Sequence, residues 1–258
     1  MRGKVYLIGA GPGDPELLTL KAARILANAD IVLHDALVSL EVLDYVSRAA
    51  EVIDVGKRAG RKLLTQDEIN SLLVSYAETR AIVVRLKGGD PSIFGRAGEE
   101  IEALREAAIQ YEIVPGISAA MGAAAAAGIS LTDRRVASQI LFTTFSRGVE
   151  GSAIDLCCVT PATTLVLYMP GAEYAEVAAR LRDGGLPEDL PCVIVSGATR
   201  PQQRILWSTV ARLASEEKLP APALMIVGRV AAQDIEEIHQ SFWGREREAR
   251  APRNVPVI

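Results

Sequence analysis

Apolar runs of strand length alternate with stretches of helical periodicity along the first half of the chain. The runs that read as strands cover residues 4–11, 29–35, 50–56, 81–89 and 111–116. The stretches that read as helices cover residues 18–29, 40–49 and 65–79, with one more between residues 89 and 111. This alternation is typical of βα units on a mostly parallel sheet. The first half is therefore predicted to be an α/β domain.

The expected helix at residues 65–79 has the clearest local signals. Thr65 and Glu68 have the spacing of a capping box, in which each side chain bonds the backbone N–H of the other residue. The apolar residues that follow recur at helical spacing and form one stripe: Ile69, Leu72, Leu73 and Tyr76. We expect this stripe to face the core.

The second half of the chain also mixes the two patterns. An alanine-rich block, Met121 to Ala127, is closed by Gly128 and reads as a helix whose small side chains allow close packing. Strand candidates follow at residues 138–145, 163–169, 191–197 and 223–228. A helix lies among them, with one face made by Tyr174, Val177, Ala178 and Leu181. The predicted organisation is an α/β domain at residues 1–131, a second α/β domain at 132–245, and a loosely held tail at 246–258.

Composition narrows the class of protein. The chain has 258 residues, 49% of them apolar, and a formal net charge of −4. No apolar stretch is long enough to cross a bilayer, and the first residues do not resemble a secretory signal. We therefore expect a cytoplasmic protein with no membrane partner. The acidic balance argues against a nucleic-acid partner, because binding to phosphate usually leaves a basic face.

Cysteine and histidine usage argues against a metal centre. Cys157, Cys158 and Cys192 have no C-x-x-C spacing, and the chain has two histidines in all. The cysteines are expected to be small buried hydrophobic residues.

The stretch YLIGAGPGDP at residues 6–15 raises the possibility of a dinucleotide-binding loop. Gly9 and Gly11 fit the G-x-G-x-x-G pattern, and Asp35 closes the next strand at about the right distance. The third glycine, Gly13, comes one place early, and Asp14 stands at the position the pattern gives to glycine. A carboxylate there would meet a pyrophosphate with like charge, so the loop suits a ligand poor in phosphate.

Two further strands end in similar turns. Residues 83–87 run into Gly88, Gly89, Asp90 and Pro91, and residues 113–114 run into Pro115, Gly116, Ile117 and Ser118. Glycine lets the backbone approach a ligand closely, and ligands of open α/β sheets bind beyond the carboxyl ends of strands. Asp90 could accept hydrogen bonds from ribose or amino groups. The three turns together therefore predict a ligand site.

Several motifs resemble, in order, those of the tetrapyrrole methylase family, and in particular its members that C-methylate uroporphyrinogen III. The resemblance covers about residues 3–230. It is carried by GAGPGDPELLTLKA, HDALVS, VGKRAG, TQDEIN, VVRLKGGDPSIFGRAGEE and VPGISAA. It implies a two-domain α/β enzyme, usually a homodimer, that binds S-adenosylmethionine between its domains and methylates two pyrrole carbons, giving precorrin-2.

The resemblance also implies site residues. Cofactor-contacting positions are matched by Pro12, Gly88, Gly89, Asp90, Ile93, Ser118 and Ala119 in the first domain, and by Met169 and Ala198 in the second. Asp35 and Lys57 match the positions of proton acceptor and proton donor. On the residue pattern alone, Asp35 is equally consistent with a turn or cap residue, Lys57 with a solvated charge and Met169 with a core residue.

A substrate rimmed with carboxylates calls for a local positive surface. Arg96 is expected to anchor substrate, since guanidinium pairs with carboxylates through two hydrogen bonds, and Glu99 to hold Arg96 in place. On the residue pattern alone, Glu99 is also consistent with a solvated helix start. A second basic group is formed by Lys57, Arg58, Arg61 and Lys62. Arg134 and Arg135 are as consistent with binding propionates as with a linker surface.

Three departures from the family pattern lie on the expected substrate side. Ala36 stands where arginine is common, Asp133 where histidine is common, and Thr144–Phe145 fall in FTTFSRG, which replaces F-V-T-G-H. Arg147 or Arg135 could supply the cationic contact that is lost. The identity of the tetrapyrrole is the expectation that these departures affect most.

Other readings remain open. A methylase of the same fold could act later in corrin synthesis, on ribosomal RNA or on a modified histidine. A different class, an NAD-dependent or nucleotide-binding protein, would rest on the first glycine turn and is opposed by Asp14. A family member that binds tetrapyrrole without catalysis is opposed by the presence of both Asp35 and Lys57.

Overall fold

A computed structural model of the chain describes residues 2–56, 64–145, 156, 159–160, 162–171 and 174–232. Contacts between residues divide the chain into two compact units, Met1–Ala126 with Gly197–Arg204, and Ala127–Ser196 with Ile205–Ile258. Each unit contains a five-stranded sheet. The expectation of two α/β domains is confirmed, while the boundary at residue 131 and the tail stay predictions. The sequence pattern gave no sign that Gly197–Arg204 belongs with the first unit.

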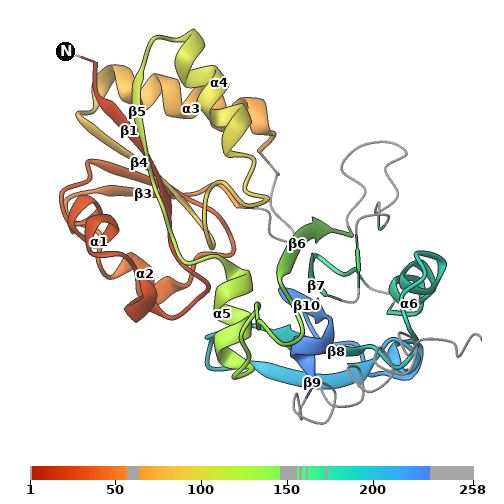
Figure 1. Cartoon of the computed structure of the whole chain (residues 1–258). Helices are drawn as coiled ribbons and strands as arrows, with labels where there is room; N and C mark the ends of the chain where they lie inside the picture. Colours follow the sequence, from red (N-terminus) through yellow and green to blue (C-terminus); the bar gives the residue numbers. More distant parts are fainter. Residues whose placement is uncertain are drawn as a thin grey trace, which may run out of the picture. The chain divides into compact units, whose positions relative to one another are not determined.

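The first unit is built on a parallel sheet (Figure 1). Its strands lie in the order β3 (Glu51–Asp54), β2 (Ile31–His34), β4 (Ile82–Lys87), β1 (Lys4–Gly9) and β5 (Gln110–Val114). Every neighbouring pair is parallel. All five strands therefore end at the same edge, where the glycine turns follow β1, β4 and β5.

Helices cover both faces of this sheet (Figure 1). One face packs against α3 (Gln66–Thr79) and α4 (Ala97–Glu106), and the other against α1 (Leu20–Leu26) and α2 (Leu40–Leu43). The helix expected at 40–49 is shorter than predicted, because the Ser47 N–H donates to the carbonyl of Leu26 and not within a helix. The one-turn η1 (Pro15–Leu17) precedes α1, and α5 (Ala119–Ala126) follows β5.

Two local predictions are confirmed in α3 and α5. Both hydrogen bonds of the Thr65–Glu68 capping box are present. The stripe of α3 is buried most deeply at Ile69 and Leu73, while Leu72 and Tyr76 pack half-buried against the same core. Small residues let α5 approach the first glycine turn closely, since a Cβ on Gly122 would lie 2.7 Å from the ring of Pro12.

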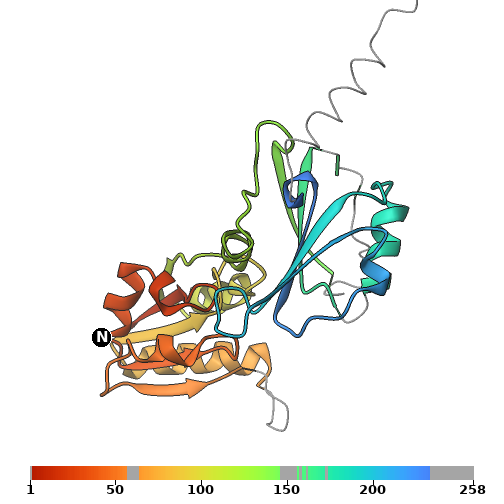
Figure 2. The same cartoon turned by 90° about the horizontal axis from the view of Figure 1, so that it is seen from below.

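The second unit has a mixed sheet in the order β6 (Gln139–Thr144), β7 (Thr163–Tyr168), β10 (Ala223–Val227), β8 (Pro191–Ser196) and β9 (Arg204–Thr209). Strand β6 is parallel to β7, and β10 is antiparallel to β7 and β8. Helix α6 (Tyr174–Asp183) lies against this sheet (Figure 2) and buries the predicted face. The short helices η2 (Leu213–Ser215) and η3 (Arg229–Ala231) complete the described elements.

Strand β9 was not expected from the sequence. It lies at the edge of its sheet, and most of its residues are half-buried. The predicted burial of cysteine is confirmed at Cys192, whereas Cys157 and Cys158 lie outside the described residues. None of the helices that the structure describes is long and apolar enough to traverse a bilayer. Likewise, no cluster of metal-ligating side chains is found among the described residues.

Candidate active site

The glycine turns after β1, β4 and β5 meet at the carboxyl edge of the first sheet. The N–H of Gly11 donates to the carbonyl of Gly89 at 3.2 Å, and the Gly89 N–H donates back to the Gly11 carbonyl at 2.8 Å. The Gly116 N–H donates to Oδ2 of Asp90 at 3.0 Å. These bonds join all three turns into one structure.

Glycine is required where the turns approach one another. A Cβ on Gly9 would lie 2.6 Å from the backbone of Gly116 and from the carbonyl oxygen of Gly89. Gly11 and Gly89 have φ angles of +77° and +68°, which side-chain-bearing residues rarely adopt. The three turns thus bring backbone without side chains together where the strands end.

Most of the predicted cofactor residues lie in or next to these turns. Gly88, Gly89 and Asp90 form the turn after β4, and Ile93 follows it, its N–H donating to the Asp90 carbonyl at 3.2 Å. Asp90 braces the turn, because its Oδ1 accepts from the N–H of Ser92 at 2.8 Å. Ser118 and Ala119 start α5, and Pro12 packs on that helix. The structure thus brings together these seven predicted residues.

Asp14 occupies the start of η1, as its sequence position suggested. Its Oδ1 accepts from the N–H of Glu16 at 2.8 Å, and its own N–H donates to Oγ1 of Thr199 at 3.0 Å. A carboxylate therefore already satisfies the helix start, where a pyrophosphate would bind in a dinucleotide site.

Ala198 and Met169, the remaining predicted cofactor residues, fall in different units. Ala198 belongs to the first unit, and its carbonyl oxygen would lie 3.3 Å from a Cβ on Gly13. Met169 follows β7 in the second unit, has a φ angle of +50° and is 49% exposed. Its exposure opposes the reading of Met169 as a core residue, and a strained φ is often found at functional positions.

Asp35, the predicted proton acceptor, directly follows β2. Its Oδ1 accepts a hydrogen bond from Nη2 of Arg85. The side chain is 31% exposed, whereas that of Arg85 is 2% exposed. Lys57, the predicted proton donor, lies outside the described residues, as do Arg58, Arg61 and Lys62.

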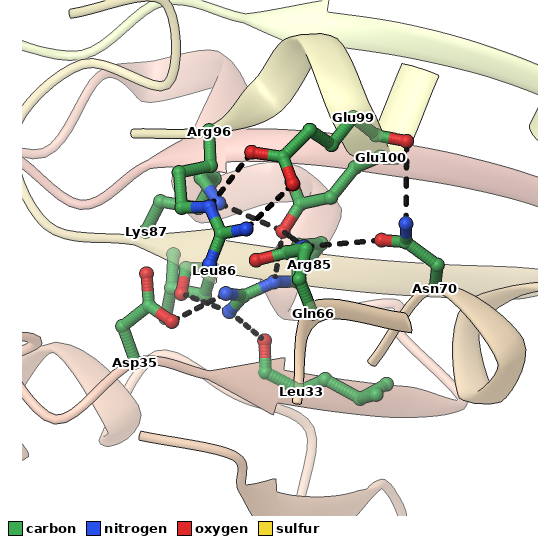
Figure 3. A network of polar contacts seen from close by, with 10 residues as sticks. All are labelled: Leu33, Asp35, Gln66, Asn70, Arg85, Leu86, Lys87, Arg96, Glu99 and Glu100. Carbon is green, nitrogen blue, oxygen red and sulfur yellow. Dashed lines mark hydrogen bonds and ion pairs between the residues drawn. The ribbon is translucent and has the colours of Figure 1, made fainter. Parts of the chain in front are cut away.

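A buried charge network extends from Asp35 into the first unit (Figure 3). Oε1 of Glu100 accepts from Nε of Arg85 and from Nζ of Lys87, both at 2.8 Å. Burial lowers the pKa of Arg85, but the charges of Asp35 and Glu100 outweigh burial and raise it overall. The pKa of Lys87 is lowered, first by burial and then by the charge of Arg85.

Arg85, Lys87 and Glu100 were not singled out by sequence reasoning. The available signal was the alternation in VVRLKGG, which places two cations on the same side of a strand whose other residues are apolar. Charged residues are rarely buried unless they are paired. The partner, Glu100, lies on the next helix and could not be identified without the fold.

Arg96 and Glu99 form an exposed ion pair at the start of α4. Nε and Nη2 of Arg96 donate to the two oxygens of Glu99 at 2.7 and 2.5 Å. This bond raises the pKa of Arg96 and lowers that of Glu99. Phe94 and Arg96 have φ angles of +51° and +56°, so the loop before α4 carries backbone strain. The expected contact between the two side chains is confirmed.

Of the other arginines considered from the sequence, the structure describes Arg134 and Arg135. Arg135 is held by Asp133, with Nη2 to Oδ2 at 2.7 Å, and this pairing lowers the pKa of Asp133 to about 2. Arg134 is exposed, and Arg147 lies outside the described residues. Arg135 is thus already paired with a carboxylate of its own loop.

A pocket of about 650 Å³ lies within the first unit, between residues 13–15, 38–41 and 199–202, and Ala36 also lines it. None of the nine predicted cofactor residues lines this pocket. We therefore do not assign the cofactor to it.

Comparison with known proteins finds consistent matches. Residues 4–214 match the family model of the tetrapyrrole (corrin/porphyrin) methylases. A siroheme synthase of Gluconobacter oxydans is 50% identical over 234 residues, which are 88% of this chain and 49% of the relative. A uroporphyrinogen-III C-methyltransferase of Paracoccus denitrificans is 48% identical over 236 residues, 89% of this chain and 82% of the relative.

A solved structure is also similar to this chain. The uroporphyrin-III C-methyl transferase of Thermus thermophilus complexed with S-adenyl homocysteine is 38% identical and has a TM-score of 0.77, covering 88% of this chain and 98% of that one. This chain spans about half of the siroheme synthase (49%) and 63% of a chloroplastic uroporphyrinogen III methyltransferase of Arabidopsis thaliana.

Proposed function

The chain belongs to the tetrapyrrole (corrin/porphyrin) methylases, and on this premise we propose that it transfers methyl groups from S-adenosylmethionine to C2 and C7 of uroporphyrinogen III, giving precorrin-2. The observation that carries the proposal is the union of three glycine turns beside Asp35, with Asp14 closing the helix start that a dinucleotide would need. The relatives named above support the choice of donor and acceptor.

The side-chain-free backbone of the three turns suits an adenosine-bearing ligand with no phosphate. Its contacts would come from the nine residues named above, Met169 among them. When bound, S-adenosylmethionine supplies an electrophilic methyl group on a sulfonium. The protein's contribution to such a displacement is mainly to position the reacting atoms.

The proposed chemistry also needs proton transfer at the macrocycle. Asp35 is assigned as proton acceptor and Lys57 as proton donor. Arg96 is assigned to a substrate carboxylate, because it is exposed and its ion pair at the start of α4 is with exposed Glu99. An incoming carboxylate could exchange with Glu99 on the guanidinium.

Two experiments test this function. S-adenosylhomocysteine should raise the melting temperature whereas NAD should not, because only a ligand of the folded state stabilises it. Incubation with uroporphyrinogen III and S-adenosylmethionine under reducing conditions should add two methyl masses, and Asp35→Asn should reduce the gain to a small residual rate. A folded, donor-binding protein that adds no methyl group would overturn the assignment, and methylation of a later corrin precursor alone would replace the substrate.

We also propose that the protein is a cytoplasmic homodimer without a nucleic-acid partner. The net charge of −4 supports the last point. Sedimentation equilibrium would test the dimer, and a band-shift assay with ribosomal RNA would test the absence of RNA binding.

A further inference from the structure

Strand β4 carries two cations into the interior of the first unit. Arg85 and Lys87 lie on β4, which is an inner strand between β2 and β1, and each side chain is only 2% exposed. They follow Val83 at alternate positions, on the face where Val83 belongs to the apolar core under α3 and α4. Apolar side chains of similar volume at such positions often give equal or greater stability. Stability alone therefore does not account for these charges.

Glu100 collects the donors of this network (Figure 3). It is fully buried, and its Oε1 accepts from Arg85, from Lys87 and, at 3.4 Å, from Nε2 of Gln66 on α3. Its Oε2 is buried with no hydrogen-bond partner in the part of the chain that the structure describes. A carboxylate with three donors on one oxygen and none on the other is not arranged for the lowest energy, since an unpaired buried oxygen is costly.

Arg85 links this buried anion to Asp35. Its Nε faces Glu100, its Nη2 faces Asp35, and its Nη1 donates to the carbonyls of Leu33 and Leu86 at 3.4 and 3.3 Å. Every nitrogen of the guanidinium thus has a fixed partner. A planar fork of this kind sets the direction of its bonds, which a lysine ammonium cannot do.

The hydrogen bond from Arg85 fixes one oxygen of the Asp35 carboxylate and leaves the other oxygen available. Arg85 engages Oδ1, and Oδ2 accepts no hydrogen bond from the described residues. The side chain is 31% exposed, so the unengaged oxygen can meet a ligand. Asp35 directly follows β2, at the sheet edge where the glycine turns gather.

We propose that Arg85 and Glu100 are positioning residues that hold the Asp35 carboxylate in one orientation for proton transfer, with Lys87 balancing the charge of Glu100. This inference rests on the proposed function, because it takes Asp35 as the proton acceptor. The network would act through Asp35 alone and would touch neither substrate nor donor.

The test compares Arg85→Lys and Glu100→Gln with the wild type and with a control, Arg105→Lys, which changes an exposed arginine of α4. Rates are measured per folded molecule, with uroporphyrinogen III and S-adenosylmethionine. Both test variants should lower kcat, by about a hundredfold for a displacement near 1 Å. The affinity for S-adenosylhomocysteine should stay within about twofold, and the control should match the wild type in both.

A combined variant separates positioning from a general structural role. Added to Asp35→Asn, Arg85→Lys should change the residual rate by no more than about twofold, because its effect would already be lost. Full additivity of the two losses would overturn the proposal, as would an unchanged kcat in both single variants.

Crystal structures of wild type and Arg85→Lys complete the test without any substrate. The proposal expects the Asp35 carboxylate to leave its wild-type orientation in the variant, and an unmoved carboxylate would overturn it. If the wild type methylates nothing, the proposed function fails on its own, while these two structures still decide whether Arg85 holds Asp35. If Arg85→Lys does not fold, Glu100→Gln is used in its place, both in combination with Asp35→Asn and in the crystal structures.

Discussion

Replacing Glu100 by glutamine removes a buried negative charge and keeps the shape of the side chain. In the wild type, the charges of Arg85 and Lys87 are balanced by those of Asp35 and Glu100. In Glu100→Gln the group carries a net positive charge with both cations still 2% exposed. The change therefore leaves an uncompensated charge where water cannot screen it.

The expected loss of stability follows from this geometry. Breaking a buried ion pair by removing one partner typically costs about 3–5 kcal/mol. For a chain of this size each kcal/mol lowers the melting temperature by about 2–4 °C, so a fall of about 6–20 °C is expected. Glu102→Gln, an exposed site on the same helix, is the matched control and should stay within about 0.5 kcal/mol of wild type.

A second substitution tests whether charge is the cause. Lys87→Met alone should cost less than Glu100→Gln, because burial and Arg85 lower the pKa of Lys87 and so already disfavour its charged form. Combining the two restores neutrality, and the double variant should be more stable than Glu100→Gln.

Urea denaturation followed by far-UV circular dichroism gives the free energies of unfolding. A Glu100→Gln variant within about 1 kcal/mol of wild type would refute the reasoning, since an uncompensated buried charge cannot be that cheap. If the double variant loses as much free energy of unfolding as the two single variants together, lost contacts, and not charge, account for the loss of stability.

Three other predictions concern single residues. Gly9→Ala should lose about 1–3 kcal/mol and weaken S-adenosylhomocysteine binding in calorimetry, because its Cβ would meet backbone at 2.6 Å, whereas Gly98→Ala, with open space around the Cβ, should do neither. Hydrogen bonds from Lys21 and Lys4 lower the pKa of Glu112 to about 2. The stabilisation provided by ionised Glu112 is present above the ordinary carboxyl pKa and is lost as pH falls toward 2. The melting temperatures of wild type and Glu112→Gln should therefore converge over that range. Burial raises the pKa of Cys192 to about 12, so iodoacetamide at pH 8 should leave it unmodified in the folded protein and label it after unfolding, as read by peptide mass.

The features predicted correctly from the sequence are those with local causes. The capping box depends on Thr65 and Glu68 alone, and the glycine turns depend on backbone conformations that glycine permits. The missed features depend on residues distant in the sequence. Strand β9 lies at a sheet edge and lacks a long buried run, and Gly197–Arg204 joins the first unit through contacts such as that of Thr199 with the Asp14 N–H.

Arg85 illustrates the limit at the site itself. The sequence shows a cation between apolar residues on a strand, which signals a buried partner without identifying it. Its two anionic partners come from the residue after β2 and from α4, and parallel pairing sets which residue lies beside it. Register between strands is fixed by burial over the whole sheet, so pattern reading could not assign Asp35 to Arg85.

Two adjacent glutamates in the first turn of α4, at the end of the sequence RAGEE, form two different kinds of ion pair. Consecutive helical residues point about 100° apart, and here Glu99 faces the exposed Arg96 while Glu100 faces the buried Arg85. An exposed pair is worth about 0–1 kcal/mol, so a carboxylate of the proposed substrate would displace Glu99 at little cost. The buried pair is out of reach of substrate and cannot exchange in this way. This difference supports the two proposals, that Arg96 binds substrate and that Arg85 holds the Asp35 carboxylate in place.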